Sequence, residues 1–206
     1  FFPYGGLTRS VNLVATPIIY ISDINIDTAN NGDINIEVTA SEFDKVVVEI
    51  IDKEENIVSK ADSNNSSISL KLNNPNLWSP SNPYLYKARI SLIINNTIID
   101  KYDEEFGFRD IKIDGGKVLL NGEPLFLSGF GKHEDFPIVG RGQFRPAYLR
   151  DYELMRWIGA NSYRTSHYPY DEEMMRLADK LGFLIIDEVP AVSLGFWSNE
   201  FEELQP

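Results

Sequence analysis

Three groups of side chains capable of acid–base or metal-binding chemistry lie at or just after apolar runs in the second half of the sequence. The runs are residues 125–127, 161–165 and 183–186, and the groups are Lys132-His133-Glu134-Asp135, Arg164 with His167, and Asp187-Glu188. If the runs are parallel strands, their carboxyl ends meet at one edge, where the ligands of α/β folds bind. We therefore expect both histidines of the chain and several carboxylates to share one rim.

Two kinds of active site fit this rim. In a metallohydrolase, His133, Asp135 and His167 would be the metal ligands, although the first run is followed by no His-x-His pair and the chain has only two histidines. In a sugar-processing site, arginine and histidine would hold sugar hydroxyls and a nucleophilic carboxylate, while carboxylic groups elsewhere do the acid–base work. A structural interpretation also stays open, for example an ion pair of Arg164 with Asp187 or Glu188.

A β-α-β-α-β order from about Asp110 onward would position these groups. The helical repeats are Tyr148, Tyr152, Met155 and Ile158 before a stop at Gly159, and Met174, Leu177, Ala178 and Leu181 before a stop at Gly182. The acidic triplet of residues 171–173 precedes the second repeat, as the dipole of a helix N-terminus favours. Residues 183–186 are apolar throughout, which is typical of a parallel strand covered on both faces. The pattern predicts part of a parallel α/β domain.

The region from about residue 22 to residue 108 predicts an antiparallel β-sandwich. Apolar residues alternate with polar ones in several short stretches, among them Ile34-Ile36-Val38, Val46-Val48-Ile50 and Ile68-Leu70-Leu72. Turns rich in Asn, Asp and Ser separate the stretches, and short strands at such spacing are typical of a sandwich. Residues 7–17 predict one further strand, which need not belong to that sandwich.

The composition excludes several classes of protein. The 206 residues are 43% hydrophobic, and 31 acidic against 19 basic residues give a net charge of −12, which disfavours nucleic acid and anionic membranes as partners. The absence of cysteine excludes disulfides, thiolate zinc sites and a cysteine nucleophile. No apolar run is long enough to span a bilayer, and no signal peptide begins the sequence. Since the sequence starts at Phe1 and stops at Pro206 in mid-pattern, we expect a segment of a longer protein, with a cytoplasmic location.

A long motif with fixed spacing resembles a known family. Asn161-Ser162-Tyr163-Arg164-Thr165-Ser166-His167-Tyr168-Pro169, followed by Met174-Met175, Asp179, Gly182 and residues 183–186, resembles the first signature of glycoside hydrolase family two. Residues 128–135 and 157–160 resemble the β-glucuronidase branch of that family, and so do residues 1–11, which look like the closing strand of its N-terminal jelly roll. Residues 76–80 with 84–86 resemble its immunoglobulin-like domain, so the resemblance covers the whole chain.

The resemblance implies an architecture of three parts. Residues 1–17 would be the terminal strand of a jelly-roll sugar-binding domain, residues 18–109 an immunoglobulin-like β-sandwich, and residues 110–206 the first β-α-β-α-β part of a (β/α)8 TIM barrel. The implied reaction is the retaining hydrolysis of terminal β-D-glucuronides through a covalent glycosyl-enzyme, with one glutamate as nucleophile and a second as acid and base. Both glutamates are expected outside this segment, which alone should be inactive.

The same resemblance implies partners and leaves alternatives open. No cofactor and no metal are expected, the substrates would be glucuronide conjugates, and the full-length enzyme would be a homo-oligomer, either a dimer or a tetramer. A β-galactosidase or a β-galacturonidase of the same family is the near alternative. A metal-dependent TIM-barrel hydrolase and a non-catalytic carbohydrate-binding fragment are the alternatives from other classes.

Three residues match functional positions of the family, and two more are interpreted as their partners. His167 matches the histidine that contacts the sugar, and His133 matches one that lines the same pocket. Arg164 matches an arginine beside the nucleophile, where a fixed positive charge would lower the pKa of that carboxyl. Asp187 and Glu188 would orient Arg164 or His167. The resemblance also places the loop after residue 190, with its aromatic side chains, near the mouth of the site.

Overall fold

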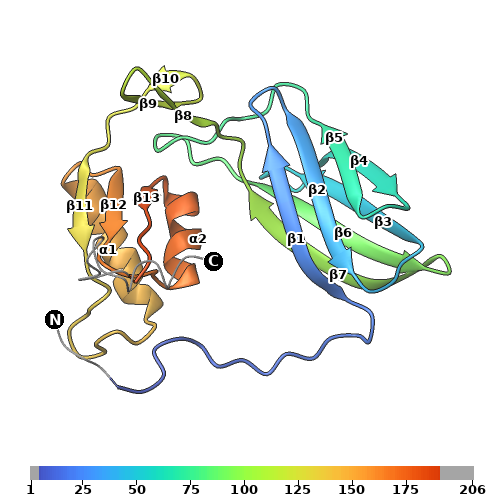
Figure 1. Ribbon diagram of the computed structural model, residues 1–206, viewed down its shortest axis with the longest axis horizontal. Helices are drawn as coiled ribbons and strands as arrows, with labels where there is room; N and C mark the ends of the chain where they lie inside the picture. The colour runs from blue at the N-terminus through green and yellow to red at the C-terminus, as the bar shows by residue number, and fades with distance from the viewer. Residues whose placement is uncertain (1–4, 191–206) are drawn as a thin grey trace, which may run out of the picture. The chain divides into compact units, whose positions relative to one another are not determined.

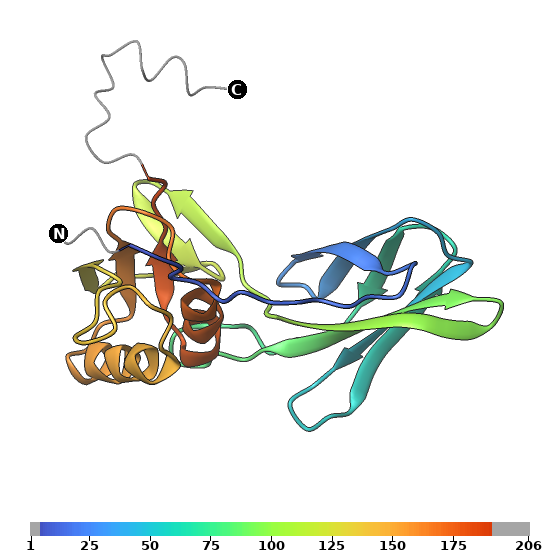
Figure 2. The same ribbon diagram turned by 90° about the horizontal axis from the view of Figure 1, so that it is seen from below.

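The computed structural model describes residues 5–190, which divide into two compact units (Figure 1 and Figure 2). One unit contains residues 12–126, and the other combines residues 5–11 with residues 127–190. Each unit has its own buried apolar core. No helix among the described residues is both long enough and apolar enough to cross a membrane.

The first unit is built around an antiparallel β-sandwich. One sheet has the strand order β1-β2-β5 and the other has the order β4-β3-β6-β7. The strands are β1 (Ile21–Thr28), β2 (Asp33–Ala40), β3 (Lys45–Ile51), β4 (Ile57–Ser63), β5 (Ser67–Lys71), β6 (Tyr86–Ile94) and β7 (Thr97–Phe106). Seven strands divided between two antiparallel sheets in this way form an immunoglobulin-like sandwich. The alternating pattern predicts an antiparallel sandwich, and the family resemblance implies its immunoglobulin-like form.

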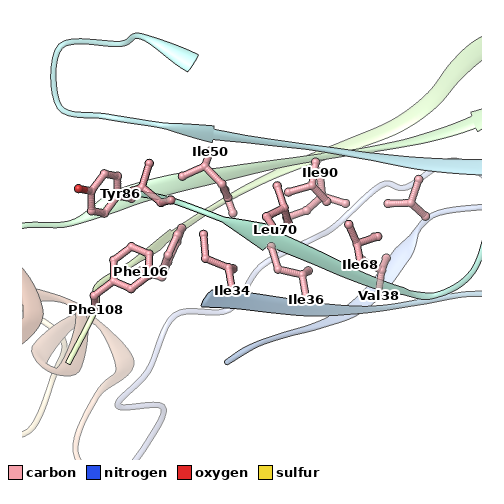
Figure 3. Close-up of a cluster of buried hydrophobic side chains, with 14 of the residues drawn as sticks. Ile34, Ile36, Val38, Ile50, Ile68, Leu70, Tyr86, Ile90, Phe106 and Phe108 are labelled. Atoms are coloured by element: carbon pink, nitrogen blue, oxygen red, sulfur yellow. The ribbon is translucent and has the colours of Figure 1, made fainter. Parts of the chain in front are cut away.

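The apolar faces of the two sheets meet in the core of the sandwich (Figure 3). Ile34, Ile36 and Val38 project from β2 toward Ile50 of β3 and Ile90 of β6, and each of the five is at most 2% exposed. Burial of each such side chain contributes about 1.5–3 kcal/mol relative to its exposure to water. The alternation of buried and exposed residues along β2 therefore fixes which face of the strand enters the core.

A small three-stranded sheet follows the sandwich in the chain and belongs to the same compact unit. Its strands β8 (Ile111–Asp114), β9 (Lys117–Leu120) and β10 (Glu123–Pro124) pair antiparallel in the order β10-β9-β8. Asn121 ties the sheet to its surroundings, since its Oδ1 accepts from the amide of Asp110 and its Nδ2 donates to the carbonyl of Trp78, both at 3.0 Å. The sequence did not predict this sheet, and the domain boundary at residue 110 stays a prediction.

The second unit contains a parallel sheet with two helices (Figure 1). The sheet has the order β11-β12-β13, with parallel pairing throughout. The chain order is β11 (Gly129–Lys132), α1 (Arg145–Trp157), β12 (Ser162–Thr165), α2 (Glu172–Leu181) and β13 (Leu184–Ile186). This order confirms the predicted β-α-β-α-β pattern.

The two helices have the boundaries and buried faces that their sequences favour. The buried faces consist of Tyr148, Tyr152 and Met155 in α1, and of Met174, Leu177 and Ala178 in α2. The side chain of Asp171 caps α2 by accepting from the amide of Glu173 at 2.8 Å. Gly182 ends α2 with φ 80°, a left-handed conformation that glycine adopts without steric cost.

Two strand predictions are wrong. Residues 7–17 form no strand, because a strand needs a neighbour for its ladder of hydrogen bonds. Among the described residues, this segment makes one backbone hydrogen bond, which Gln143 donates to Thr8. Residues 125–127 are not the first barrel strand either, and Phe126 is 84% exposed. The strand is β11, which starts at Gly129 and contains two glycines that lower its apparent strand propensity.

Candidate active site

Arg164 lies on the face of the parallel sheet opposite the helices. Side chains alternate between the two faces along a strand, and Tyr163 of β12 is buried in the core that the helices share. Arg164, the next residue, therefore points to the other face, and its side chain is 46% exposed. On β11, Gly131 is the register partner of Arg164, and a Cβ at Gly131 would lie 3.4 Å from Nη2 of Arg164. The missing side chain thus leaves space for the guanidinium.

The carboxylate of Glu188 joins Arg164 to His167. Its Oε1 lies 2.9 Å from Nε of Arg164, and its Oε2 lies 3.2 Å from Nδ1 of His167. Arg164 belongs to β12, His167 to the turn after β12, and Glu188 follows the end of β13 by two residues. An acceptor shared between a guanidinium and an imidazole fixes the orientation of both groups.

Asp187 is linked to this ion pair through Thr165. Oγ1 of Thr165 donates to Oδ1 of Asp187 at 2.8 Å and accepts from the amide of Glu188 at the same distance. Thr165 is fully buried, so the hydroxyl is held between strands β12 and β13. The geometry therefore connects Asp187 to Arg164 and His167 indirectly, by way of Thr165 and Glu188.

His133 lies beside His167. The two imidazole rings have centroids 5.7 Å apart in an edge-on arrangement with an interplanar angle of 76°. The ring of Tyr168 has its centroid 6.2 Å from that of His133. The structure thus brings His133, Arg164, His167 and Glu188 together from the ends of three neighbouring strands. Their roles toward a ligand stay predictions.

Buried tyrosines form the support of this rim. Burial raises the pKa of Tyr163 and of Tyr170 well above the usual value for a phenol, and it raises the pKa of Tyr148 to about 12. These phenols are therefore neutral at physiological pH. The hydroxyl of Tyr170 donates to the backbone carbonyl of Lys132, the residue before His133. A neutral hydroxyl thus holds the end of β11.

Sequence reasoning missed a layer of charged residues behind the histidines. Glu134 and Asp171 are 0% and 4% exposed, and both form ion pairs with Arg9. Lys132 pairs with Asp151 of α1 at 2.9 Å. The run that starts at Lys132 is visible in the sequence, but no spacing rule points from it to Arg9, which lies 125 residues away from Glu134 in the chain.

The alternative metal site is not assembled by the described residues. Within residues 5–190, no group of three or more His, Asp or Glu side chains could hold a metal ion. His133, Asp135 and His167 are therefore not gathered as one ligand set. The aromatic residues Phe196 and Trp197 of the predicted loop lie outside the described residues.

Two family models match the sequence of this chain. The model of "Glycosyl hydrolases family 2" matches residues 19–109, and that of "Glycosyl hydrolases family 2, TIM barrel domain" matches residues 111–205. The parallel sheet with its charged rim is thus the start of a glycosidase barrel. The chain belongs to glycosyl hydrolase family 2.

The chain is similar to β-glucuronidases in sequence and in structure. It is 42% identical over 212 residues to the β-glucuronidase of Streptococcus agalactiae, covering 100% of this chain and 35% of the relative. It is 38% identical over 215 residues to the β-glucuronidase of Homo sapiens, covering 97% and 33%. The β-glucuronidase from Ruminococcus gnavus in complex with D-glucuronic acid superposes with a TM-score of 0.79 at 42% identity, covering 85% of this chain and 31% of that one. The chain spans about a third of the length of the curated relatives.

Proposed function

We propose that this chain is part of a retaining β-glucuronidase, which removes terminal β-D-glucuronic acid from conjugates. Support comes from the relatives named above and from the Ruminococcus gnavus enzyme, whose structures hold D-glucuronic acid and uronic isofagomine. In this proposal the nucleophilic glutamate and the acid/base glutamate lie on parts of the barrel outside this chain, with their carboxyls about 5 Å apart. No cofactor takes part.

The observation that carries the proposal is the bridge from Arg164 through Glu188 to His167. Glu188 holds Nε of Arg164, and Ser166 Oγ accepts from Nη2 of Arg164 at 3.3 Å. A guanidinium has five N–H donors, so it can also reach a carboxylate that a later barrel strand supplies. Its fixed charge would keep such a nucleophile ionised.

The two histidines would contact the sugar. An imidazole can donate through one nitrogen and accept through the other, which suits a hydroxyl group or a carboxylate. Glu188 engages Nδ1 of His167, which leaves Nε2 on the opposite side of the ring for a ligand. His133 would line the same pocket from the end of β11.

The finer assignments belong to the same proposal. Residues 18–109 would be the immunoglobulin-like domain, and residues 110–206 would be the first part of the barrel, with residues 1–17 contributed to the jelly roll. The full-length enzyme would be a cytoplasmic homodimer or homotetramer. Light scattering of the purified enzyme and fractionation of the source cells test these two statements.

The full-length enzyme that carries this chain tests the proposal. We expect turnover of an aryl β-D-glucuronide, with a higher kcat/KM than for the matching β-D-galactoside and β-D-galacturonide. NMR of the first product should show the β-anomer, as retention requires. A higher kcat/KM for the galactoside or the galacturonide would mean that the enzyme is a β-galactosidase or a β-galacturonidase instead. Loss of turnover on adding a chelator would favour a metallohydrolase.

A further inference from the structure

Two buried carboxylates join the loop after β11 to the N-terminus of α2. Glu134 directly follows His133, and Asp171 lies four residues after His167. Oε1 of Glu134 accepts from the backbone amide of Asp171 at 2.8 Å. The side chain of Asp171 in turn caps α2. The residue beside one histidine is therefore bonded to the helix that follows the other.

Further bonds join the same two segments. The backbone amide of Glu134 donates to the hydroxyl of Tyr168 at 3.2 Å. The backbone amide of Ser166 donates to the carbonyl of Lys132, also at 3.2 Å. The residues on both sides of His133 are thus bonded to the residues on both sides of His167, so the backbone positions of the two histidines are coupled.

Arg9 forms ion pairs with both buried carboxylates. Its Nη2 lies 2.7 Å from Oε2 of Glu134, and its Nε lies 3.3 Å from Oδ2 of Asp171. The side chains of Glu134 and Asp171 are 0% and 5% exposed, while that of Arg9 is 36% exposed. Two close, buried anions are stable as ions only when a paired cation compensates them. Arg9 supplies this charge from a segment far away in the sequence.

The segment that carries Arg9 is itself anchored to the α/β unit. The amide of Gln143 donates to the carbonyl of Thr8 at 3.1 Å, and the hydroxyl of Ser10 donates to Oε1 of Gln143. Nε2 of Gln143 also donates to Oδ1 of Asp171 at 3.4 Å. Arg9 thus reaches its two carboxylates from a fixed piece of backbone.

We infer that Arg9 is a positioning residue of the active site. It holds the side chains of Glu134 and Asp171 in place, and through them it holds His133 and His167 at their edge-on separation. It acts through the two carboxylates, not as a ligand of the sugar. The inference rests on the proposed function for the choice of probe.

Binding of D-glucuronic acid to the full-length enzyme, followed by calorimetry, tests this inference. Arg9→Met removes the charge but keeps the apolar stem, and Arg9→Lys keeps a charge that cannot reach two carboxylates through two nitrogens. Arg145→Met is the matched control, because Arg145 forms an exposed ion pair with Glu173 in the same unit. The double variant Arg9→Met with Glu134→Gln removes both the cation and one buried anion.

The affinities of the variants for D-glucuronic acid distinguish a positioning role of Arg9 from a role in stability alone. Arg9→Met should weaken binding at least tenfold and Arg9→Lys at least threefold, with Arg145→Met unchanged. Glu134→Gln added to Arg9→Met should restore part of the loss, because the cluster then has one formal negative charge, as Arg9, Glu134 and Asp171 have together in the wild type. The inference is overturned if folded Arg9→Met enzyme binds like the wild type, or if the double variant recovers nothing. If Arg9→Met fails to fold, the Arg9→Lys enzyme decides in the same way. A wild-type enzyme that neither binds D-glucuronic acid nor cleaves glucuronides would instead contradict the proposed function.

Discussion

Arg164 and Glu188 form an ion pair in which Nε of the arginine lies 2.9 Å from Oε1 of the glutamate. The arginine sits on β12, and the glutamate follows β13, so the pair spans two neighbouring strand ends. Both side chains are partly exposed, at 46% and 28%. Ion pairs with such access to water contribute about 0–1 kcal/mol to stability. The pair is therefore of more consequence for the orientation of the rim than for the fold.

Replacement of Glu188 by glutamine should impair catalysis more than folding. The variant keeps the shape of the side chain but loses the charge that holds Arg164 and His167. We expect kcat/KM for an aryl glucuronide to fall at least tenfold, about 1.4 kcal/mol of transition-state stabilisation. Steady-state kinetics of the full-length enzyme measure this change, and Glu173→Gln on the outside of α2 serves as the control. Equal kinetics of the two variants would show that the bridge has no functional role.

Replacement of His167 by alanine should also reduce activity at least tenfold. Its side chain is 41% exposed, so truncation costs little packing, while it removes the imidazole that the proposed function assigns to sugar binding. The melting temperature of the full-length enzyme should stay close to that of the wild type. Wild-type kinetics in the folded variant would mean that the histidine has a structural role only.

Replacement of Gly131 by alanine should disturb Arg164 through Ser166. The new Cβ would lie 2.5 Å from Oγ of Ser166, which must then move away from Nη2 of Arg164. We expect kcat/KM to fall about tenfold. Ser166→Ala removes the same hydroxyl without a clash, so it should lower kcat/KM to a similar extent, and Gly131→Ala added to it should cost little more. A large further loss in the double variant would mean that the glycine matters for the backbone of β11 and not for the guanidinium.

The sequence predicts the elements whose periodicity is strong. The period of two in β2 and β3 defines the sandwich, and the helical repeats with their glycine stops define α1 and α2. The strand β11 escapes this reasoning because Gly129 and Gly131 look like a loop, while their lack of side chains makes room for Ser162, Arg164 and Ser166. Local strand propensity favours residues 125–127, the apolar triplet before the glycines. Tertiary packing instead places the strand at the glycines.

The candidate site is predictable only in part for a similar reason. His133 and His167 follow strand ends and Arg164 lies in the last half of β12, so topology alone gathers them at one rim. The contact of Arg9 with Glu134 joins residues 125 positions apart, and no periodic pattern records such a pair. Asp187 and Glu188 make different contacts because their side chains point in different directions. Their adjacent positions in the sequence do not reveal these directions.

The buried hydroxyl of Tyr148 should make stability sensitive to high pH. Burial raises its pKa to about 12, above the value of about 10 in an unfolded chain. The folded state therefore keeps a proton that the unfolded state loses. This contribution to stability is complete below pH 10 and is lost as the pH rises toward 12, by about 1 to 2 kcal/mol. Tyr148→Phe lacks this loss of stability. The melting temperature of the variant minus that of the wild type should therefore increase between pH 9 and 11.5.

At neutral pH, phenylalanine substitutions at the two tyrosines of α1 should have different effects on stability. The hydroxyl of Tyr148 has no hydrogen-bond partner among the described residues, so Tyr148→Phe should be neutral or stabilising. The hydroxyl of Tyr152 donates to the carbonyl of Met174 at 2.5 Å and lies 2.8 Å from that of Tyr163. Tyr152→Phe should therefore destabilise the enzyme by about 1–3 kcal/mol, because it leaves buried polar groups unpaired. The opposite order of the two variants would contradict the hydrogen bonds of this core.

The 206 residues expressed alone should show no turnover of an aryl glucuronide and should tend to aggregate. The parallel sheet of the described residues has three strands, with β11 and β13 at its edges, whereas a closed barrel of this class has eight. Ile186 of β13 is 52% exposed on the open face, and an unpaired apolar edge is a template for association. Size-exclusion chromatography and a long-incubation assay measure both properties. Turnover by the isolated chain would mean that a nucleophile and an acid lie within it, contrary to the proposal that both glutamates are supplied by later barrel strands.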